Sequence, residues 1–330
     1  MTNSAFPLPV PSGSAFTKNL IFNGSFLLWQ RATSFSTAGT LYGPDRWQVS
    51  GNGGTNGVFS QQPGPTSGTF YLRVQRNPGD TGTADLMVAT SLTRDMCIGA
   101  AGNQLTLTFK VLCGANFSAA LSQMTCQIYS GTGSTDTSII GGFSGVVLQA
   151  NPITTLTTVE QTITVNTLTL GTNVTTLAAL FRYTPTGTAG ANDWFEIRDV
   201  QLAIGPNIIG YEYVPLAQEI PRCQYFYCKS YNLTTNPGTV TPDGYRYHSW
   251  IASTAQRATF ASFPVTMRIT PTIVTYSPGA GGAGLVDYIG TGGVASFTTG
   301  AGQSSVGIGS NSGTSSTQMA YHFTADAEVL

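Results

Sequence analysis

The stretch LTLTFKV at residues 105–111 decides the fold class of this chain of 330 residues. Its apolar residues fall on every second position, with threonine or lysine between them, which is the period of a strand that buries one face. Residues 70–75 (FYLRVQ) and residues 321–325 (YHFTA) repeat this alternation. No window of twelve or more residues between 19 and 215 keeps a helical period, so the sequence predicts an all-β protein.

Two predicted strands contain an alternation that slips by one residue. In residues 195–204 (FEIRDVQLAI) the apolar positions change phase beside Asp199, and in residues 163–170 (ITVNTLTL) they change phase near Asn166. One extra residue in a strand produces such a slip, so we expect a β-bulge at each place. Many short strands separated by Gly-, Ser- and Thr-rich turns predict a jelly-roll β-sandwich over residues 19–215.

The chain before this sandwich is predicted to be extended. Residues 1–18 carry Pro7, Pro9 and Pro11 on alternate positions. Because proline fixes φ and removes a backbone donor, we expect an extended arm there instead of a helix.

The chain after the sandwich divides into two further parts. Residues 216–231 are expected to form a linker, with one helical turn followed by an aromatic-rich boundary element that is buried from two sides. Residues 232–330 alternate again and predict a second, C-terminal β-sandwich. Within it, we expect residues 263–269 (FPVTMRI) to form one strand.

The composition excludes several partners. Charged residues make up 9% of the chain, and 14 basic against 15 acidic residues give a net charge of −1. This balance lacks the surplus of cations that nucleic acid binding needs. No apolar run approaches the ~20 residues that span a bilayer, and residues 1–22 lack the apolar core of a secretory signal, so we expect no membrane insertion. Since charge keeps surfaces apart, low charge favours a homo-oligomer.

Residues for catalysis or metal binding are sparse. Asp193, Glu196 and Asp199 lie close in sequence, and paired carboxylates could cleave glycosides if held ~5–9 Å apart. We prefer to interpret them as an acidic loop with a surface charge pair. His248 and His322 are the two histidines, and neither a nucleophile elbow nor a CxxC or HxxxH pair occurs. We therefore expect no enzyme activity, no catalytic residue, no metal and no cofactor.

Aromatic residues offer a different chemistry. Exposed rings bordered by polar groups can hold a sugar, because the CH faces of the sugar stack on the ring while polar side chains bind its hydroxyls. A cluster beside the PDG turn at residues 242–244 supplies the primary candidates, which are Tyr245, Tyr247, His248 and Trp250. The secondary candidates are Trp29, Tyr42, Asp45 and Trp47. A role as core or interface anchors is the competing interpretation for these aromatic residues, and we favour burial in the core for Trp29 and Trp47.

Several motifs of this chain resemble those of tailed-bacteriophage tail fibre and virion surface fibre proteins. The motifs of the first region are NLIFNGSFLLWQR (19–31), DRW (45–47), FEIRDVQLAIG (195–205) and CQYFYCKSY (223–231). Those of the second region are FPVTMR (263–268), PT (271–272) and YHFTADAE (321–328). The combination is more specific than any one piece.

Residues 19–215 are also similar to carbohydrate-binding-module jelly rolls. The first strand of those modules carries an NG-x-F signature, here residues 23–26, and the last carries a D-V-x-L signature, here residues 199–202. Some of the modules hold a structural calcium with a Glu after the Phe and an Asp before the Val. Here Leu27 replaces the first of these, although Asp199 matches the second. Because Ca²⁺ takes 6–8 oxygen ligands, calcium is not expected.

The resemblance implies a non-enzymatic virion component that is assembled in the host cytoplasm. It would be a tail fibre or related appendage, commonly a trimer, that binds host-surface polysaccharide. The arm would attach it to other virion proteins through Phe6, Pro7, Pro9 and Pro11, and residues 232–330 would contact the host. Two alternatives stay open, namely a capsid decoration or head fibre protein with a mechanical role and, with less support, a polysaccharide depolymerase.

Overall fold

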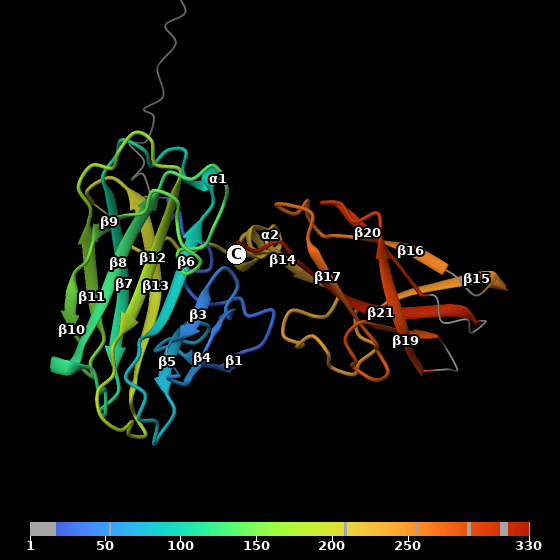
Figure 1. Ribbon diagram of the computed structural model, residues 1–330, viewed down its shortest axis with the longest axis horizontal. Helices are drawn as coiled ribbons and strands as arrows, with labels where there is room; N and C mark the ends of the chain where they lie inside the picture. The colour runs from blue at the N-terminus through green and yellow to red at the C-terminus, as the bar shows by residue number, and fades with distance from the viewer. Residues whose placement is uncertain are drawn as a thin grey trace, which may run out of the picture.

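The computed structural model describes residues 18–52, 54–207, 210–254, 257–288, 292–310 and 316–329. Within these residues nearly all regular structure is antiparallel strand, arranged in three sheets, which confirms the predicted all-β fold. Figure 1 shows two sheets packed together and a third extending away from them, with the C-terminus near the junction. The predicted virion anchor, with Phe6, Pro7, Pro9 and Pro11, lies outside the described residues.

The first two sheets form what we call the N-terminal body, residues 19–204. The described strands of its first sheet are, in spatial order, β1 (Ser34–Thr37), β4 (Gly57–Pro63), β5 (Phe70–Arg76), β13 (Trp194–Ile204), β7 (Leu105–Cys113) and β11 (Gln161–Asn166). Those of the second sheet are β10 (Ile153–Thr155), β8 (Gln123–Gly131), β12 (Thr176–Tyr183), β6 (Leu86–Leu92), β3 (Gln48–Gly51) and β2 (Thr40–Tyr42), with β9 (Val147–Ala150) paired to β8. The connections include two short helical segments, α1 (Arg94–Cys97) and η1 (Ala120–Ser122).

Strand alternation builds the core between these two sheets. In β7 the side chains of Leu107, Phe109 and Val111 are buried, as the sequence predicts. The ring of Phe109 meets that of Phe181 on β12 of the opposite sheet, with centroids 4.8 Å apart and nearly perpendicular planes. Burying an aromatic side chain of this size contributes about 1.5–3 kcal/mol, so these cross-sheet contacts hold the sandwich closed.

The NG pair explains how the N-terminal segment joins the body. The Asn23 amide donates to the carbonyl oxygens of Leu28 and Asp45, at 2.8 and 3.1 Å, and its oxygen accepts from the Leu28 N–H. The Gly24 carbonyl accepts from the Val200 N–H at 2.9 Å, which ties the segment to β13. A Cβ at position 24 would lie 2.0 Å from the Val200 carbonyl oxygen, so only glycine fits.

One of the two expected bulges is present. The register between β13 and β7 shifts between Arg198 and Gln201, and Asp199 adopts a positive φ of 51°. The prediction of a bulge near Asn166 is wrong. The strand β11 pairs regularly with β7 and ends at Asn166, so the later apolar residues belong to the loop that follows.

The third sheet forms what we call the C-terminal region, residues 227–329. Its described path is β14 (Tyr227–Lys229), β21 (Ser316–Asp326), β18 (Leu285–Tyr288), β19 (Gly292–Thr299), β20 (Ser305–Ser310) and β16 (Arg257–Ser262). Two more strands, β15 (Arg246–Thr254) and β17 (Thr272–Tyr276), also pair with β21. The long strand β21 is therefore shared, because one half pairs with β15 and β18 and the other with β14 and β17.

The prediction of a strand at residues 263–269 is wrong. Phe263 and Met267 are buried, but the segment is irregular and its N–H groups bond to the carbonyls of Ser304 and Gln303. Pro264 has no N–H to give to a ladder, so apolar alternation alone does not make a strand here.

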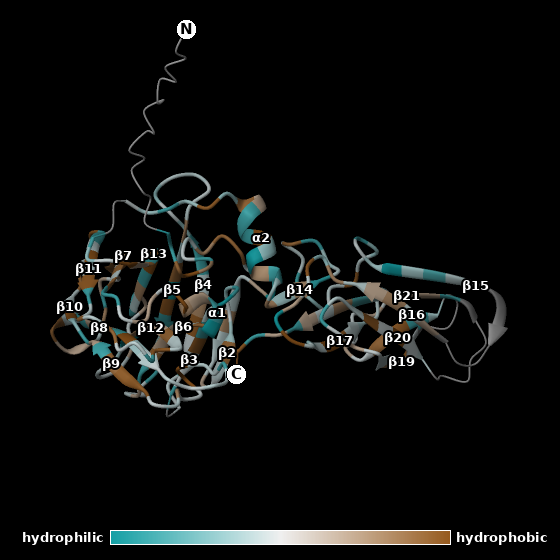
Figure 2. Ribbon diagram, turned by 90° about the horizontal axis from the view of Figure 1, so that it is seen from above, coloured by the Kyte–Doolittle hydropathy of each residue, from teal (hydrophilic) through white to brown (hydrophobic). Residues whose placement is uncertain are grey.

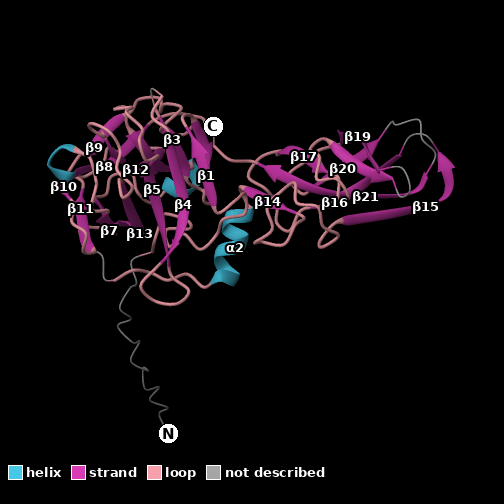
Figure 3. Cartoon of the chain, turned by 90° about the horizontal axis from the view of Figure 1, so that it is seen from below, coloured by secondary structure: helices cyan, strands magenta, loops and turns pink. Residues whose placement is uncertain are grey.

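The junction between body and C-terminal region is built by the boundary element. Helix α2 (Leu216–Gln224) is longer than the single turn expected, and it contains Pro221 in its interior. It lies between the two parts (Figure 3). Phe226 follows it, fully buried, with the guanidinium of Arg46 3.5 Å above its ring. Arg46 also forms a buried ion pair with Glu328, so residues near both ends of the chain meet at this point.

No described helix is long and apolar enough to cross a membrane.

Candidate functional site

The outer face of the first sheet carries a row of polar side chains. Because β7 and β11 alternate, Thr108 and Lys110 lie on the face opposite the core, beside Thr164 and Thr162. Both threonines of β11 are exposed. The Thr108 hydroxyl oxygen is buried and has no hydrogen-bond partner among the described residues.

The bulge in β13 adds a carboxylate to this face. Asp199 is buried, and its Oδ2 lies 3.2 Å from the Lys110 ammonium and 2.7 Å from the Arg198 guanidinium. The Tyr213 hydroxyl donates to the same oxygen at 3.1 Å. A non-glycine residue with positive φ is uncommon and persists where its surroundings hold it. Here these three contacts hold it.

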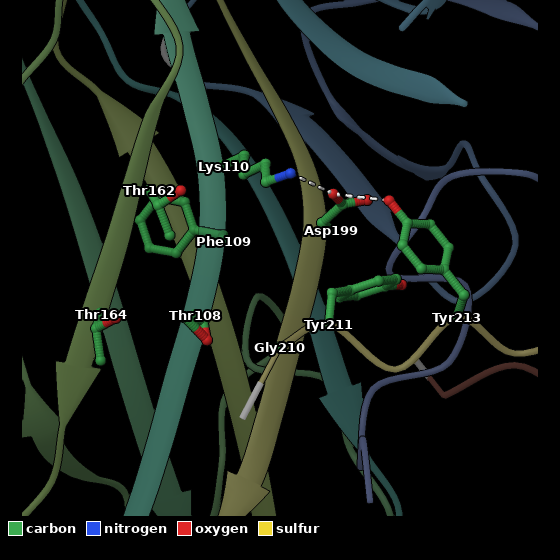
Figure 4. Close-up of a pocket in the computed structure, with 9 residues that line it drawn as sticks. All are labelled: Thr108, Phe109, Lys110, Thr162, Thr164, Asp199, Gly210, Tyr211 and Tyr213. Atoms are coloured by element: carbon green, nitrogen blue, oxygen red, sulfur yellow. Dashed lines mark hydrogen bonds and ion pairs between the residues drawn. The ribbon is translucent and has the colours of Figure 1, made fainter. Parts of the chain in front are cut away.

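Two tyrosines complete a pocket of about 420 Å³. Tyr211 and Tyr213 follow β13, and their rings meet edge to face with centroids 4.7 Å apart. Tyr213 is 56% exposed. Burial and the neighbouring Asp199 carboxylate raise the pKa of both hydroxyls, so both remain protonated donors. Figure 4 shows the Lys110–Asp199–Tyr213 contacts on one side of the pocket and the threonines of β7 and β11 on the other.

A second ion pair extends the face beyond the pocket. Arg198 binds Glu160 through two hydrogen bonds of 2.6 and 2.8 Å, and Tyr71 donates its hydroxyl to the same carboxylate. Burial by itself would raise the pKa of Glu160, but the hydrogen bonds from Arg198 and Tyr71 outweigh it and lower that pKa. The face is therefore polar, aromatic and close to neutral.

The three clustered acids of β13 do not meet in one site. Asp193 is buried and pairs with Arg76, whereas Glu196 pairs with Arg73 at 2.7 Å. Asp199 pairs with Lys110 and Arg198, as described above. Both expectations, a surface charge pair and an acidic loop, are wrong, because Glu196 is 5% exposed and its pair with Arg73 is not a surface pair, and because Asp193 is an internal ion-pair partner and not part of an acidic loop.

Two of the secondary candidates are core residues. Trp47 is fully buried against Phe26, with ring centroids 5.0 Å apart. Trp29 is 5% exposed, and its indole N–H donates to the Phe26 carbonyl at 2.8 Å. Neither ring can stack on a sugar, so the glycan-binding prediction for both is wrong, and the competing interpretation as core residues holds.

The other two secondary candidates lie at the junction. Asp45 is 1% exposed and accepts from the Gln30 side-chain amide at 2.7 Å, so it is not placed to contact a ligand. Tyr42 is half-buried on the rim of a groove between body and C-terminal region, and its hydroxyl donates to the Val329 carbonyl.

The structure brings two of the primary candidates, Tyr245 and Tyr247, together at the start of β15, whereas strand alternation places His248 on the opposite face. Tyr245 and Tyr247 are 37% and 46% exposed, and their rings meet edge to face at 6.3 Å. His248 is exposed, and its Nδ1 lies 3.3 Å from the Thr259 hydroxyl. Figure 2 shows mainly hydrophilic colouring where this strand begins. The side chain of Trp250 lies outside the described residues, and sugar binding at this cluster stays a prediction.

Metal ligands do not gather around the matching calcium position. Asp199 faces two cationic side chains, as shown above, and Leu27 offers no oxygen. Within the described part of the chain, no group of three or more His, Cys, Asp or Glu side chains is placed to hold a metal ion.

The sequence matches no family model and no curated protein. Among solved structures, the family 11 carbohydrate-binding module from Clostridium thermocellum, in complex with a β-1,3-1,4-mixed-linked tetrasaccharide, is 15% identical over 52% of this chain and 97% of that chain, with a TM-score of 0.32. An apo-form cyclase from Fischerella sp. is 14% identical over 59% of this chain and 100% of that chain, with a TM-score of 0.39.

The enzymatically active domain of tailspike protein 4 from bacteriophage CBA120 is 8% identical over 57% of this chain, and the match covers 21% of that chain, with a TM-score of 0.32. Likenesses of this size carry no functional argument, so the function rests on this chain's own residues.

Sequence reasoning missed the pocket on the first sheet. One signal was available, because the phase slip already marked Asp199 as displaced from the regular alternation. The spacing of Tyr211 and Tyr213 also places both rings on one side of an extended segment. What the sequence could not show is that this segment folds back beside β7 and β11.

Proposed function

We propose that this chain is a non-enzymatic virion component, a phage tail fibre or related appendage, that binds host-surface glycan on the outer face of its first sheet. The observation that carries the glycan-binding part is the pocket beside the Asp199 bulge. It combines an exposed tyrosine ring, threonine hydroxyls and an ion-paired carboxylate, which are groups that stack on a sugar ring and bind its hydroxyls.

The virion part of the proposal rests on the motif resemblance described above. The non-enzymatic part is supported by the electrostatics of the face. The carboxylates of this face are held in ion pairs, Glu160 and Asp199 with Arg198 and Glu196 with Arg73, which leaves none of the three as a free general acid or base. Assembly as a trimer, attachment through the arm and a second contact at Tyr245 and Tyr247 belong to the same proposal. Weak sites of this kind gain avidity when several copies are linked.

The test is binding of the full chain to a glycan array and to purified host polysaccharide. Thr164→Arg fills the pocket from an exposed position and should abolish binding to the preferred glycan. Thr66→Arg, in the exposed turn between β4 and β5, adds the same charge elsewhere and should leave binding unchanged.

Three outcomes would count against the proposal. Unchanged binding by Thr164→Arg would remove the pocket from it. Loss of polysaccharide viscosity on incubation would replace it with a depolymerase. Finding the chain on the capsid lattice of intact particles would favour the decoration protein.

A further inference from the structure

A second and larger cavity lies where the N-terminal body meets the C-terminal region. Its volume is about 570 Å³, which is within the usual range for a small-molecule site. Arg31 and Tyr42 of the body line one wall, and Tyr276 and Asp326 of β17 and β21 line the other. We call this cavity the junction groove. None of its polar lining residues takes part in the sheet pocket described above.

The charges of the junction groove are already paired within the protein. The Arg31 guanidinium lies 2.9 Å from the Asp326 carboxylate and 3.7 Å from the centre of the Tyr227 ring. Glu328, which also lines the groove, is paired with Arg46. Each cation therefore has a carboxylate partner, and the groove offers no unmatched charge to an ionic ligand.

The groups that remain open in the groove are hydroxyls and apolar surface. Thr270 and Thr272 are exposed on its rim, and Ile269 beside them is 46% exposed. The Tyr276 ring is half-buried, and the Asp326 side chain keeps 40% of its surface exposed, so it can accept further hydrogen bonds. A ligand that matches this lining has hydroxyl groups on a partly apolar ring and carries no net charge.

We propose that the junction groove is a second ligand site and that it binds an uncharged saccharide, independently of the sheet pocket. This site does not require the proposed virion role. It depends on the walls, which come from two parts of the chain, and on the balanced charge between them. The ligand would contact Tyr42 of the body and Tyr276 of the C-terminal region together, and so would bridge the two.

The experiment titrates the full chain with three neutral probes, cellotetraose, maltotetraose and chitotetraose, and with tetragalacturonate as the charged counterpart. Isothermal titration calorimetry and ligand-observed NMR are the readouts. Thr272→Arg obstructs the junction groove from an exposed position, Thr164→Arg obstructs the sheet pocket, and Thr66→Arg is the matched control. Thermal denaturation confirms that each variant is folded.

The expected result is that at least one neutral probe binds, and that Thr272→Arg weakens one class of sites tenfold or more. Thr164→Arg should leave that class unchanged, and tetragalacturonate should not occupy it. Three outcomes would overturn the proposal. The first is that Thr272→Arg changes the binding of none of the probes, and the second is that the Thr164→Arg protein binds no probe at all. The third is that tetragalacturonate binds with the same affinity as the neutral probes. Binding lost only in Thr164→Arg would also overturn the proposal while leaving the sheet pocket supported.

Discussion

The N-terminal body and the C-terminal region are both built from antiparallel strands, but they place their ion pairs differently. In the body, Arg76 and Asp193 pair at 3.3 Å with no exposed side-chain surface. In the described part of the C-terminal region, every ion pair crosses to the body instead. These pairs are Arg31–Asp326, Arg31–Glu328, Arg46–Glu328 and Arg268–Asp136.

This difference indicates that the stability of the C-terminal region depends on its contacts with the body. The body has its own buried core and its own internal ion pairs. The C-terminal region has a smaller core cluster around Met267, Tyr321 and Phe323. Its described ion pairs lie only at the junction, where they contact the body. We therefore expect the junction to determine whether the two parts unfold together or apart.

The largest effect should come from breaking the junction. Glu328→Ala leaves the Arg46 guanidinium buried without its carboxylate, and removal of one partner of a buried pair costs about 3–5 kcal/mol. Calorimetry should then resolve two transitions, whereas we expect a single one from the parent protein, because the variant's C-terminal region is no longer held to the body by this ion pair.

A matched surface pair provides the control for the junction variant. Asp85→Ala removes the partner of Arg182, whose side chain is 38% exposed, and should cost at most about 1 kcal/mol. If Glu328→Ala lowered the free energy of unfolding as little as Asp85→Ala does, the junction would not couple the unfolding of the two parts.

A smaller effect is expected where the N-terminal segment joins the body. In Gly24→Ala the new methyl group meets the Val200 carbonyl oxygen, so the segment must move away from β13, at a cost of about 1–3 kcal/mol. Denaturant unfolding measures this change. Gly39→Ala, where a Cβ meets nothing closer than 3.7 Å, should stay within about 0.5 kcal/mol of the parent. Equal stability of the two variants would contradict the close approach.

Glycan affinity can decide which part of the chain binds. Tyr213→Ala removes the exposed ring of the sheet pocket and should weaken binding about tenfold, equivalent to about 1.4 kcal/mol. Tyr213→Phe keeps the ring and loses only the bond to Asp199, so it should bind nearly as well as the parent. If Tyr247→Ala carried the loss instead, the site would lie on β15 of the C-terminal region.

The last effect is a pH dependence of the junction. Burial lowers the pKa of Lys229 to about 8, although its ammonium donates to the carbonyls of Leu233 and Thr235 at 2.9 and 2.7 Å. Between this value and the ordinary 10.5 the unfolded chain binds more protons than the folded one, so Lys229 makes stability rise with pH in that window.

Lys229→Met isolates this contribution, because buried tyrosines act on both proteins alike. Unfolding free energies measured from about pH 8 to 10.5 should rise less steeply in the variant. Parallel curves for the two proteins would show that Lys229 titrates normally.

Part of the candidate site was predictable from local pattern. The slip beside Asp199 predicted the bulge, because a strand has a period of two and any inserted residue changes the phase. The roles of Trp29 and Trp47 were not predictable in this way. An aromatic residue in a loop-rich stretch can face solvent or core, and only packing against Phe26 shows which.

The amino-acid sequence by itself determined the all-β class and the faces of strands such as β7, since alternation is a local property. The tertiary structure alone decided which faces are covered and which residues meet. Arg46 and Glu328 are 282 positions apart, and the sheet pocket joins β7, β11 and the segment after β13. Such contacts depend on how whole sheets pack, and no periodicity within a single segment records that.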